Sequence, residues 1–215
     1  KISQSTISID FDSWNRVWFS SFQAEEANLG IYPNGGISYI SFDGDPSTTN
    51  LFSYKVVKFD ETVWSLRMGK NNRLYFLTPT GLSYYDINES TSPISRQSPY
   101  PFYPNISFGS GSGIEIDHLG NIWTYSNSQG IHVLLENTSY WPDINGIRTS
   151  NSFLLSDEIR DVDFDPKNNL VYIATNQGIN GLRIPFGEPK DNYSSLKIYP
   201  SPFYTLISLS RPFIR

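Results

Sequence analysis

The sequence predicts an all-β fold, on the basis of its composition, the strand-like alternation of its apolar residues and an internal period. Aromatic residues make up 15% of the 215 residues and charged residues 17%, while 15 Gly and 14 Pro supply turns throughout. This composition favours many short strands over long helices rich in Ala, Glu and Lys. A mostly helical chain or a disordered chain is therefore not expected.

Four similar segments recur along the chain. Each has an alternating apolar stretch, a polar turn, an aliphatic residue followed by an aromatic one, and a Gly that opens another alternating stretch. The aromatic positions are 57, 48 and 49 residues apart and the glycines 45, 49 and 48 apart, which gives a period near 48. These positions are Trp18, Tyr75, Trp123 and Tyr172, followed by Gly36, Gly81, Gly130 and Gly178. The first aromatic interval is longer because residues 23–35 extend one connection.

Each repeat predicts a meander of three or four strands, because period-2 alternation buries one face of a strand and polar Asn, Gly or Asp turns join antiparallel neighbours. The Gly that opens each third strand suits a backbone position that needs a positive φ. The expected strands cover 6–12, 17–20 and 36–40 in the first repeat, 63–68, 74–78 and 81–85 in the second, 113–117, 122–125 and 130–133 in the third, and 159–165, 171–175 and 178–182 in the fourth.

Sheets this small cannot bury both faces alone, and stacking them around an axis solves the problem, as in a β-propeller. A β-sandwich or an irregular solenoid is the alternative, but neither requires so even a period. We expect propeller blades over 1–185, at approximately 1–60, 61–111, 112–157 and 158–185, a linker over 186–194 that is rich in turn residues, and a further element over 195–215.

The repeats resemble a known family. Ile159-Arg-Asp-Val-Asp-Phe-Asp, Leu170-Val-Tyr-Ile-Ala-Thr-Asn-Gln-Gly-Ile and Ile116-Asp-His-Leu-Gly-Asn-Ile-Trp-Thr are similar to the two-component regulator propeller repeat. The similarity covers about residues 6–185, although the second repeat has Arg67-Met-Gly where the family has Asp, and the first has Ser20-Ser where Ala/Gly-Thr is usual. The resemblance implies propeller blades of extracytoplasmic sensor regions or of exported and surface proteins of Bacteroidota-like bacteria. The motif builds the blade and contains no catalytic group.

A second resemblance begins at Ser194-Ser-Leu-Lys-Ile-Tyr-Pro-Ser-Pro-Phe. It looks like the first strand of the C-terminal β-sandwich of type IX secretion cargo and of FlgD-like modules, with Ser201 in place of the usual Asn. It implies the secretion machinery as a partner through the C-terminus. The alternative is a last propeller strand and a tail.

Because the chain starts at Lys1 and contains no Cys to close a four-bladed ring, we expect a piece of a larger propeller rather than a closed small one.

Charge and residue content restrict the chemistry. A net charge of −5 and a pI near 5.0 argue against nucleic acid and anionic lipid as partners, and no apolar run is long enough for a transmembrane segment. The absence of Cys removes disulfides, thiolate metal sites and Cys nucleophiles. Gly109-Ser-Gly-Ser-Gly113 precedes a predicted strand rather than a helix, so we expect a loop there and not a phosphate site.

Candidate metal ligands are more easily explained as structural. His118 occupies a turn, and the acidic residues can cap turns or lie in solvent, although Ca²⁺ accepts such oxygen ligands. An axial metal would need ligands from several blades, and the presence of Arg67 at one of the expected axial positions argues against a carboxylate cage. The positions concerned are His118 and His132; Asp10, Asp12, Asp43 and Asp45; Asp157, Glu158, Asp161, Asp163 and Asp165; and the expected axial set Asp10, Arg67, Asp117 and Asp163. We assign no catalytic, cofactor-binding or metal-binding residue.

Aromatic residues in Pro-, Asn- and Ser-rich loops are the remaining candidates for ligand contact, because exposed rings stack on sugars and peptides. They are Trp14, Tyr100, Phe102, Tyr103, Tyr140 and Trp141, for which packing between blades is the alternative role. The predicted function is a non-catalytic extracytoplasmic scaffold or binding module of an exported or cell-surface bacterial protein, which binds a glycan, peptide or protein on a loop face. The alternatives are a lactonase- or lyase-like propeller enzyme with an axial metal, and the periplasmic sensor region of a hybrid two-component regulator.

Overall fold

The computed structural model of the chain describes residues 6–23, 34–42, 45, 52–58, 61–90, 103 and 106–186. Regular structure in these residues consists of strands and two short 3₁₀ turns, η2 (Lys70–Asn72) and η3 (Pro166–Asn168). The strands pair only antiparallel within the described ranges and form four separate sheets. The prediction of an all-β fold is confirmed for this part of the chain.

Each sheet is a meander in which every strand pairs with the next one along the chain. Sheet 1 contains β1 (Thr6–Phe11), β2 (Arg16–Gln23), β3 (Asn34–Phe42) and β4 (Phe52–Lys58). Sheet 2 contains β5 (Ser65–Met68), β6 (Arg73–Thr78) and β7 (Gly81–Asp86). Sheet 3 contains β8 (Gly113–Ile116), β9 (Ile122–Tyr125), β10 (Ile131–Leu134) and β11 (Tyr140–Trp141). Sheet 4 contains β12 (Ile159–Asp165), β13 (Leu170–Thr175) and β14 (Gly178–Arg183).

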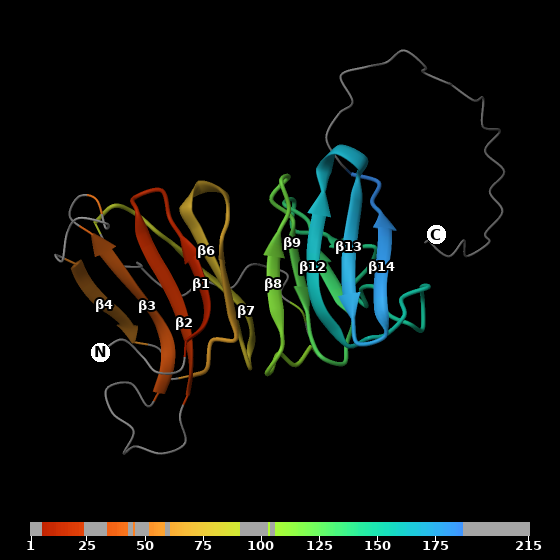
Figure 1. The fold of residues 1–215 in the computed structure, drawn as a ribbon, viewed down its shortest axis with the longest axis horizontal. Coiled ribbons are helices and arrows are strands. Elements are labelled where there is room, and N and C mark those ends of the chain that lie inside the picture. Colours follow the sequence, from red (N-terminus) through yellow and green to blue (C-terminus); the bar gives the residue numbers. More distant parts are fainter. Residues whose placement is uncertain are drawn as a thin grey trace, which may run out of the picture.

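The four sheets lie in a row in chain order, and their first strands are neighbours. β1 contacts β5, β5 contacts β8, and β8 contacts β12. Figure 1 shows sheet 1 and sheet 4 at opposite ends of the row, with sheets 2 and 3 between them. Small meanders that stack face to face with their first strands adjacent have the arrangement of β-propeller blades. The described part of the chain is therefore propeller-like.

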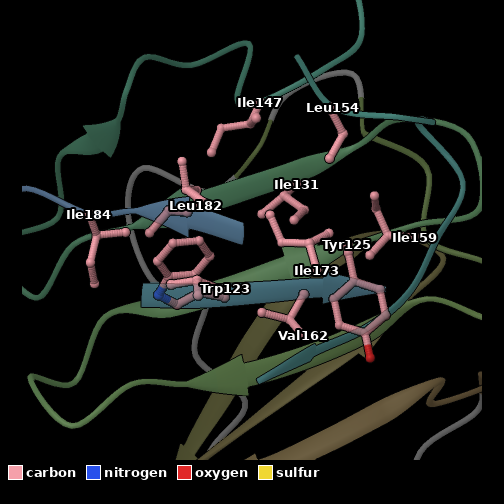
Figure 2. Close-up of a cluster of buried hydrophobic side chains, with 12 residues drawn as sticks. Trp123, Tyr125, Ile131, Ile147, Leu154, Ile159, Val162, Ile173, Leu182 and Ile184 are labelled. Atoms are coloured by element: carbon pink, nitrogen blue, oxygen red, sulfur yellow. The ribbon is translucent and has the colours of Figure 1, made fainter. Parts of the chain in front are cut away.

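A hydrophobic cluster fills each of the three interfaces between successive sheets. Trp18 and Ile37 of sheet 1 pack on Leu66 and Phe76 of sheet 2. The next cluster joins sheets 2 and 3, and the largest cluster joins sheets 3 and 4 (Figure 2). Each fully buried large apolar side chain contributes about 1.5–3 kcal/mol relative to exposure. The interfaces between sheets, rather than any one sheet, thus form the core.

The repeat positions have the roles that their spacing predicts. The four aromatic residues lie on the second strands β2, β6, β9 and β13, and Trp18 and Trp123 are fully buried. Gly81 and Gly178 open their strands with φ of 129° and 132°, a conformation that L side chains rarely adopt. The prediction of a positive φ at the repeated glycines is confirmed.

The two end sheets carry exposed apolar side chains on their outer faces. Ser8 and Asp10 of β1 bond to sheet 2, so the alternate residues Ile9 and Phe11 point the other way, and Ile9 is 55% exposed. On β14, Ile179 is 72% exposed, although Leu182, three residues further along the strand, is buried against sheet 3. Apolar alternation on both faces of a strand is typical of a sheet that is stacked on both sides.

Candidate functional site

A pocket of about 440 Å³ lies beside β10, where the segment after β11 folds back against this strand. Pockets of roughly 300–1,000 Å³ commonly hold small molecules. We call it the His132–Arg148 pocket; its lining residues are Ile106, Gln129, His132, Ile144, Asn145, Arg148, Ser150 and Asn151. Most of them belong to the connection between sheets 3 and 4, outside the repeat.

Two backbone hydrogen bonds attach this connection to β10. The Ile131 amide donates to the Ile147 carbonyl at 3.0 Å, and the Ile147 amide donates to the Ile131 carbonyl at 2.7 Å. Both side chains point into the cluster between sheets 3 and 4 (Figure 2). Gly146 permits this approach, because at its φ of 67° a Cβ atom would lie 2.2 Å from the Ile131 carbonyl oxygen. The wall of the pocket is therefore fixed to the core.

His132 forms the buried side of the pocket, and its residue exposure is only 2%. Burial lowers the pKa of His132 to about 4, and the Arg148 charge adds to this effect; the Asn145 backbone and the Asp143 charge oppose it. The imidazole is therefore neutral at pH 7. The Tyr103 ring packs edge-on against the His132 imidazole, at a centroid distance of 5.6 Å.

Arg148 is the cation of the pocket and is held in one orientation. Its Nη2 lies 3.4 Å from His132 Nε2, and since a guanidinium only donates, the neutral imidazole accepts at Nε2. Arg148 Nε donates to the Asn145 carbonyl at 3.2 Å, and the Arg148 amide donates to Asn151 Oδ1 at 2.8 Å. No carboxylate in the described part of the chain forms a salt bridge with Arg148. Its charge therefore faces the pocket without an acidic partner from these residues.

A second, smaller pocket lies between turns of sheets 2 and 3, next to Lys70 and Arg73. Both cations are already bound there. Lys70 Nζ donates to the Leu119 carbonyl at 2.6 Å, while Arg73 forms a 2.7 Å ion pair with Asp86 and stacks on the Tyr84 ring at 4.1 Å. These contacts join turns and strands, so this pocket is a weaker candidate.

The first strands of the sheets were the expected location of an axial metal site. In sheets 1 to 3, the charged side chains at the expected positions form contacts between sheets instead. Arg67 on β5 forms a two-point ion pair with Glu115 on β8, at 2.9 and 2.5 Å. Burial alone would lower the pKa of Arg67, but the hydrogen bonds and the charge of Glu115 outweigh burial and raise it. Asp10 Oδ2 accepts from the Met68 amide at 2.6 Å. Asp163 is exposed and accepts from the adjacent Phe164 amide.

The assignment of Asp117 to the axial set was wrong. Strand register places Asp10, Arg67, Glu115 and Asp163 opposite the four repeat aromatics, so Glu115 is the equivalent residue in sheet 3. Asp117 lies beyond the end of β8 and is 4% exposed. It accepts hydrogen bonds from the Leu119 and Asn121 amides, the Asn121 side chain and Trp123 Nε1. Its role is to close the turn between β8 and β9.

Asp12 has the same role in sheet 1. It accepts from the Trp14 and Arg16 amides, from Arg16 Nε and from Trp18 Nε1. Burial opposes its ionisation, but these hydrogen bonds outweigh burial and lower the pKa of Asp12. Its carboxylate oxygens are thus already occupied by protein donors.

The other candidate metal ligands are also separated or bound locally. His118 lies in the β8–β9 turn and His132 on β10, while Asp157 binds Thr149 and Asp165 binds Asn168. Asp43 lies outside the described residues. No group of three or more His, Asp or Glu side chains within the described ranges is arranged to hold a metal ion. Residues 109–112 form a turn before β8, in agreement with the predicted loop.

The predicted ligand-contact aromatics have different environments. Trp14 is partly buried, with the Arg16 guanidinium 4.9 Å from its ring centroid. Tyr103 is 2% exposed, and burial raises its pKa; the structure places it in the core, so it does not offer its ring to a surface ligand. Tyr140 and Trp141 are partly buried against the clusters on either side of sheet 3. Tyr100 and Phe102 lie outside the described residues, as do residues 187–215 with most of the predicted linker and the predicted sandwich start.

Sequence reasoning did not identify Arg148, because the connection that carries it lies outside the repeat. The available signal was the turn-forming stretch Asp143-Ile-Asn-Gly146 between two predicted strands, followed by a basic residue. His132 was considered only as a metal ligand or a structural residue. Its contact with Arg148 depends on the long-range pairing of Ile131 with Ile147, which the sequence pattern does not show.

Comparisons with known proteins agree with the propeller-like fold. Neither a protein-family model nor a curated protein matches the sequence. Among solved structures, PorZ, an essential surface component of the type-IX secretion system of Porphyromonas gingivalis, matches with a TM-score of 0.60 and 18% identity. The extracellular domain of a proposed hybrid two-component system of Bacteroides thetaiotaomicron matches with a TM-score of 0.58 and 15% identity. A gluconolactonase of Xanthomonas campestris matches with a TM-score of 0.51 and 13% identity.

These matches cover most of this chain and a smaller part of the other proteins. They cover 81%, 88% and 80% of this chain, but 25%, 23% and 54% of the three structures in the same order. The chain thus spans about a quarter of the length of the first two. At these identities the similarity is one of fold. Within the described residues, no helix is long and apolar enough to span a bilayer.

Proposed function

We propose that this chain is a non-catalytic binding or scaffold module that acts outside the cytoplasm, as part of an exported or surface-attached bacterial protein. The observation that carries the proposal is the contrast between the first strands of the sheets and the His132–Arg148 pocket. On the first strands of sheets 1 to 3, the charged groups of Asp10, Arg67 and Glu115 are used in contacts between sheets. Arg148, in contrast, faces a pocket without an acidic partner among the described residues.

The proposed location is supported by the fold. Two of the similar structures are a bacterial surface component and an extracellular domain. A sensor region of a two-component regulator is also an extracytoplasmic binding module, so the proposal includes that role. A secretion signal over 195–215 remains a prediction from the sequence.

Location is tested by adding a protease to cells of the source organism whose outer membrane has been permeabilised and whose inner membrane is intact. We expect the protein to be digested while a cytoplasmic marker is spared. Protection of the protein until the cells are lysed, in parallel with the marker, contradicts the proposal.

Catalysis is tested on the purified chain with δ-gluconolactone, in the presence of added Ca²⁺ or Zn²⁺. We expect hydrolysis at the rate of the buffer alone. Saturable hydrolysis that decreases in Asp10→Asn or Glu115→Gln contradicts a non-catalytic role and favours the lactonase-like alternative.

A further inference from the structure

The ligand that the His132–Arg148 pocket suits can be inferred from its charge, its polar groups and its apolar edges. The inference rests on the proposed binding function and specifies it. Three features decide the class: one fixed guanidinium, a set of uncharged hydrogen-bonding side chains, and two isoleucines at the margin.

The charge of the pocket suits a monoanion. Arg148 is anchored through Nε, Nη2 and its own backbone amide, and Nη1 has no hydrogen-bond partner in the described part of the chain. A guanidinium held in one plane binds a carboxylate at two points. His132 adds no charge at pH 7, and Asp143 is close enough to affect the pKa of His132. A dianion such as phosphate would therefore meet one cation and a neighbouring acid in this pocket.

The uncharged polar groups suit a ligand with hydroxyls. The side chains of Gln129, Asn145 and Ser150 line the pocket and form no hydrogen bond to another described residue. They supply donors and acceptors together, as sugar hydroxyls require. Asn151 is different, because both ends of its amide are used by Arg148 and Gly146 to hold the loop.

Apolar surface is present beside these groups. Ile106 and Ile144 line the pocket, and Ile144 is 46% exposed. Aliphatic side chains can cover the C–H face of a ring whose edge carries hydroxyls. A small acid without a ring would leave this surface in water.

We propose that the His132–Arg148 pocket binds a sugar acid, with the uronate carboxylate on Arg148 and the ring hydroxyls on Gln129, Asn145 and Ser150. The carboxylate takes the place of the missing acidic partner of Arg148. His132 is a positioning residue that fixes the guanidinium and does not itself contact the acid group.

The test is a titration of the full 215-residue chain with methyl β-D-glucuronide. Binding is measured by calorimetry and by NMR of the Arg Nε–H signals. Matched probes are methyl β-D-glucoside, acetate and inorganic phosphate. We expect the glucuronide to bind at least tenfold more tightly than each of the three, and to shift the Arg148 Nε–H signal. Equal binding of phosphate or acetate overturns the sugar-acid assignment, and no binding of the glucuronide overturns the inference.

Variants test the location. Arg148→Gln should reduce glucuronide affinity at least tenfold, to the level of the glucoside, while the matched control Arg183→Gln, at an exposed position on β14, leaves it unchanged. Ser150→Ala, at an exposed position, should weaken the glucuronide several-fold and leave acetate unchanged. If Arg148→Gln does not fold, the Arg148 Nε–H shift in the unaltered chain and the Ser150→Ala result decide. Unaltered glucuronide affinity in folded Arg148→Gln overturns the site.

Failure of this inference and failure of the proposed function have different signatures. If the chain does not bind the glucuronide but binds a neutral glycan or a peptide without turnover, this result contradicts only the sugar-acid assignment. Lactone hydrolysis or a cytoplasmic location contradicts the proposed function itself.

Discussion

The carboxylate of Asp117 accepts a hydrogen bond from the indole Nε1 of Trp123, at 3.1 Å, across the turn that joins β8 to β9. Asp12 and Trp18 form the same contact in sheet 1, at 2.8 Å. An Asp six residues before a buried Trp therefore closes the turn and satisfies the indole in both sheets. In sheet 2, Gly69 occupies the corresponding place and keeps only the backbone bond, from its amide to the Arg73 carbonyl.

Asp117→Ala should lower the free energy of unfolding by about 3 kcal/mol, because it leaves several buried donors, including Trp123 Nε1, without an acceptor. The measurement is urea denaturation followed by Trp fluorescence. Asp163→Ala is the control, since Asp163 is exposed and should change stability by no more than about 0.5 kcal/mol. Equal effects of the two substitutions would contradict the role assigned to Asp117.

The ion pair between Arg67 and Glu115 should contribute about 1 kcal/mol or less, because both side chains are partly exposed, at 33% and 21%. A double-mutant cycle with Arg67→Met and Glu115→Gln measures the coupling. We expect the coupling energy to decrease when the salt concentration is raised to 1 M. A coupling that is independent of salt would show that the pair is more strongly shielded from solvent than its exposure indicates.

His132 should make the chain less stable at mildly acidic pH. Its pKa is about 4 in the folded chain and near the ordinary 6.5 when unfolded, so between these values the unfolded chain binds more protons. Its contribution to stability is fully present above pH 6.5 and is lost as the pH falls towards 4, at up to about 1.4 kcal/mol per pH unit.

This prediction is checked by urea denaturation at pH 5, 6 and 7, with an NMR titration of the imidazole. His132→Gln should show a smaller decrease in stability from pH 7 to pH 5 than the unaltered chain. An imidazole that titrates near pH 6.5 in the folded protein would refute the prediction.

Gly146→Ala should disturb the pocket wall, because a Cβ atom there would lie 2.2 Å from the Ile131 carbonyl oxygen and 2.7 Å from His132 Cδ2. We expect a loss of about 2 kcal/mol in unfolding free energy and a loss of glucuronide binding. Gly181→Ala is the matched control on β14, where a Cβ atom would have no neighbour within 4 Å. If Gly146→Ala retains both stability and binding, the close approach of the connection to β10 is not required.

The repeat predicted much of the fold because the same local requirements recur in each sheet. A Gly with positive φ opens β7 and β14, and a Trp on β2 and β9 fills the interface with the next sheet. These positions depend on strand alternation and turn chemistry, which are visible in the sequence. Tyr172 follows the same spacing but is 46% exposed, because its face of sheet 4 points away from sheet 3.

The candidate site was less predictable because it depends on tertiary contacts. Asp117 could be distinguished from Glu115 only by the strand register and by the hydrogen bond to Trp123. The contact of Arg148 with His132 requires the connection after β11 to return to β10. Such a return follows from packing and not from the period of the sequence.

The division of the core into three separate clusters means that the stability of this molecule is close to a sum of terms for single sheets and for adjacent pairs, as in linear repeat arrays. A defect in the interface between sheets 3 and 4 is then felt mainly by those two sheets, while sheets 1 and 2 keep their mutual contacts. Amide exchange should accordingly occur in blocks that match the sheets. A row built in this way can also be lengthened by one sheet at a time, because each added sheet needs to fit only the face of its neighbour.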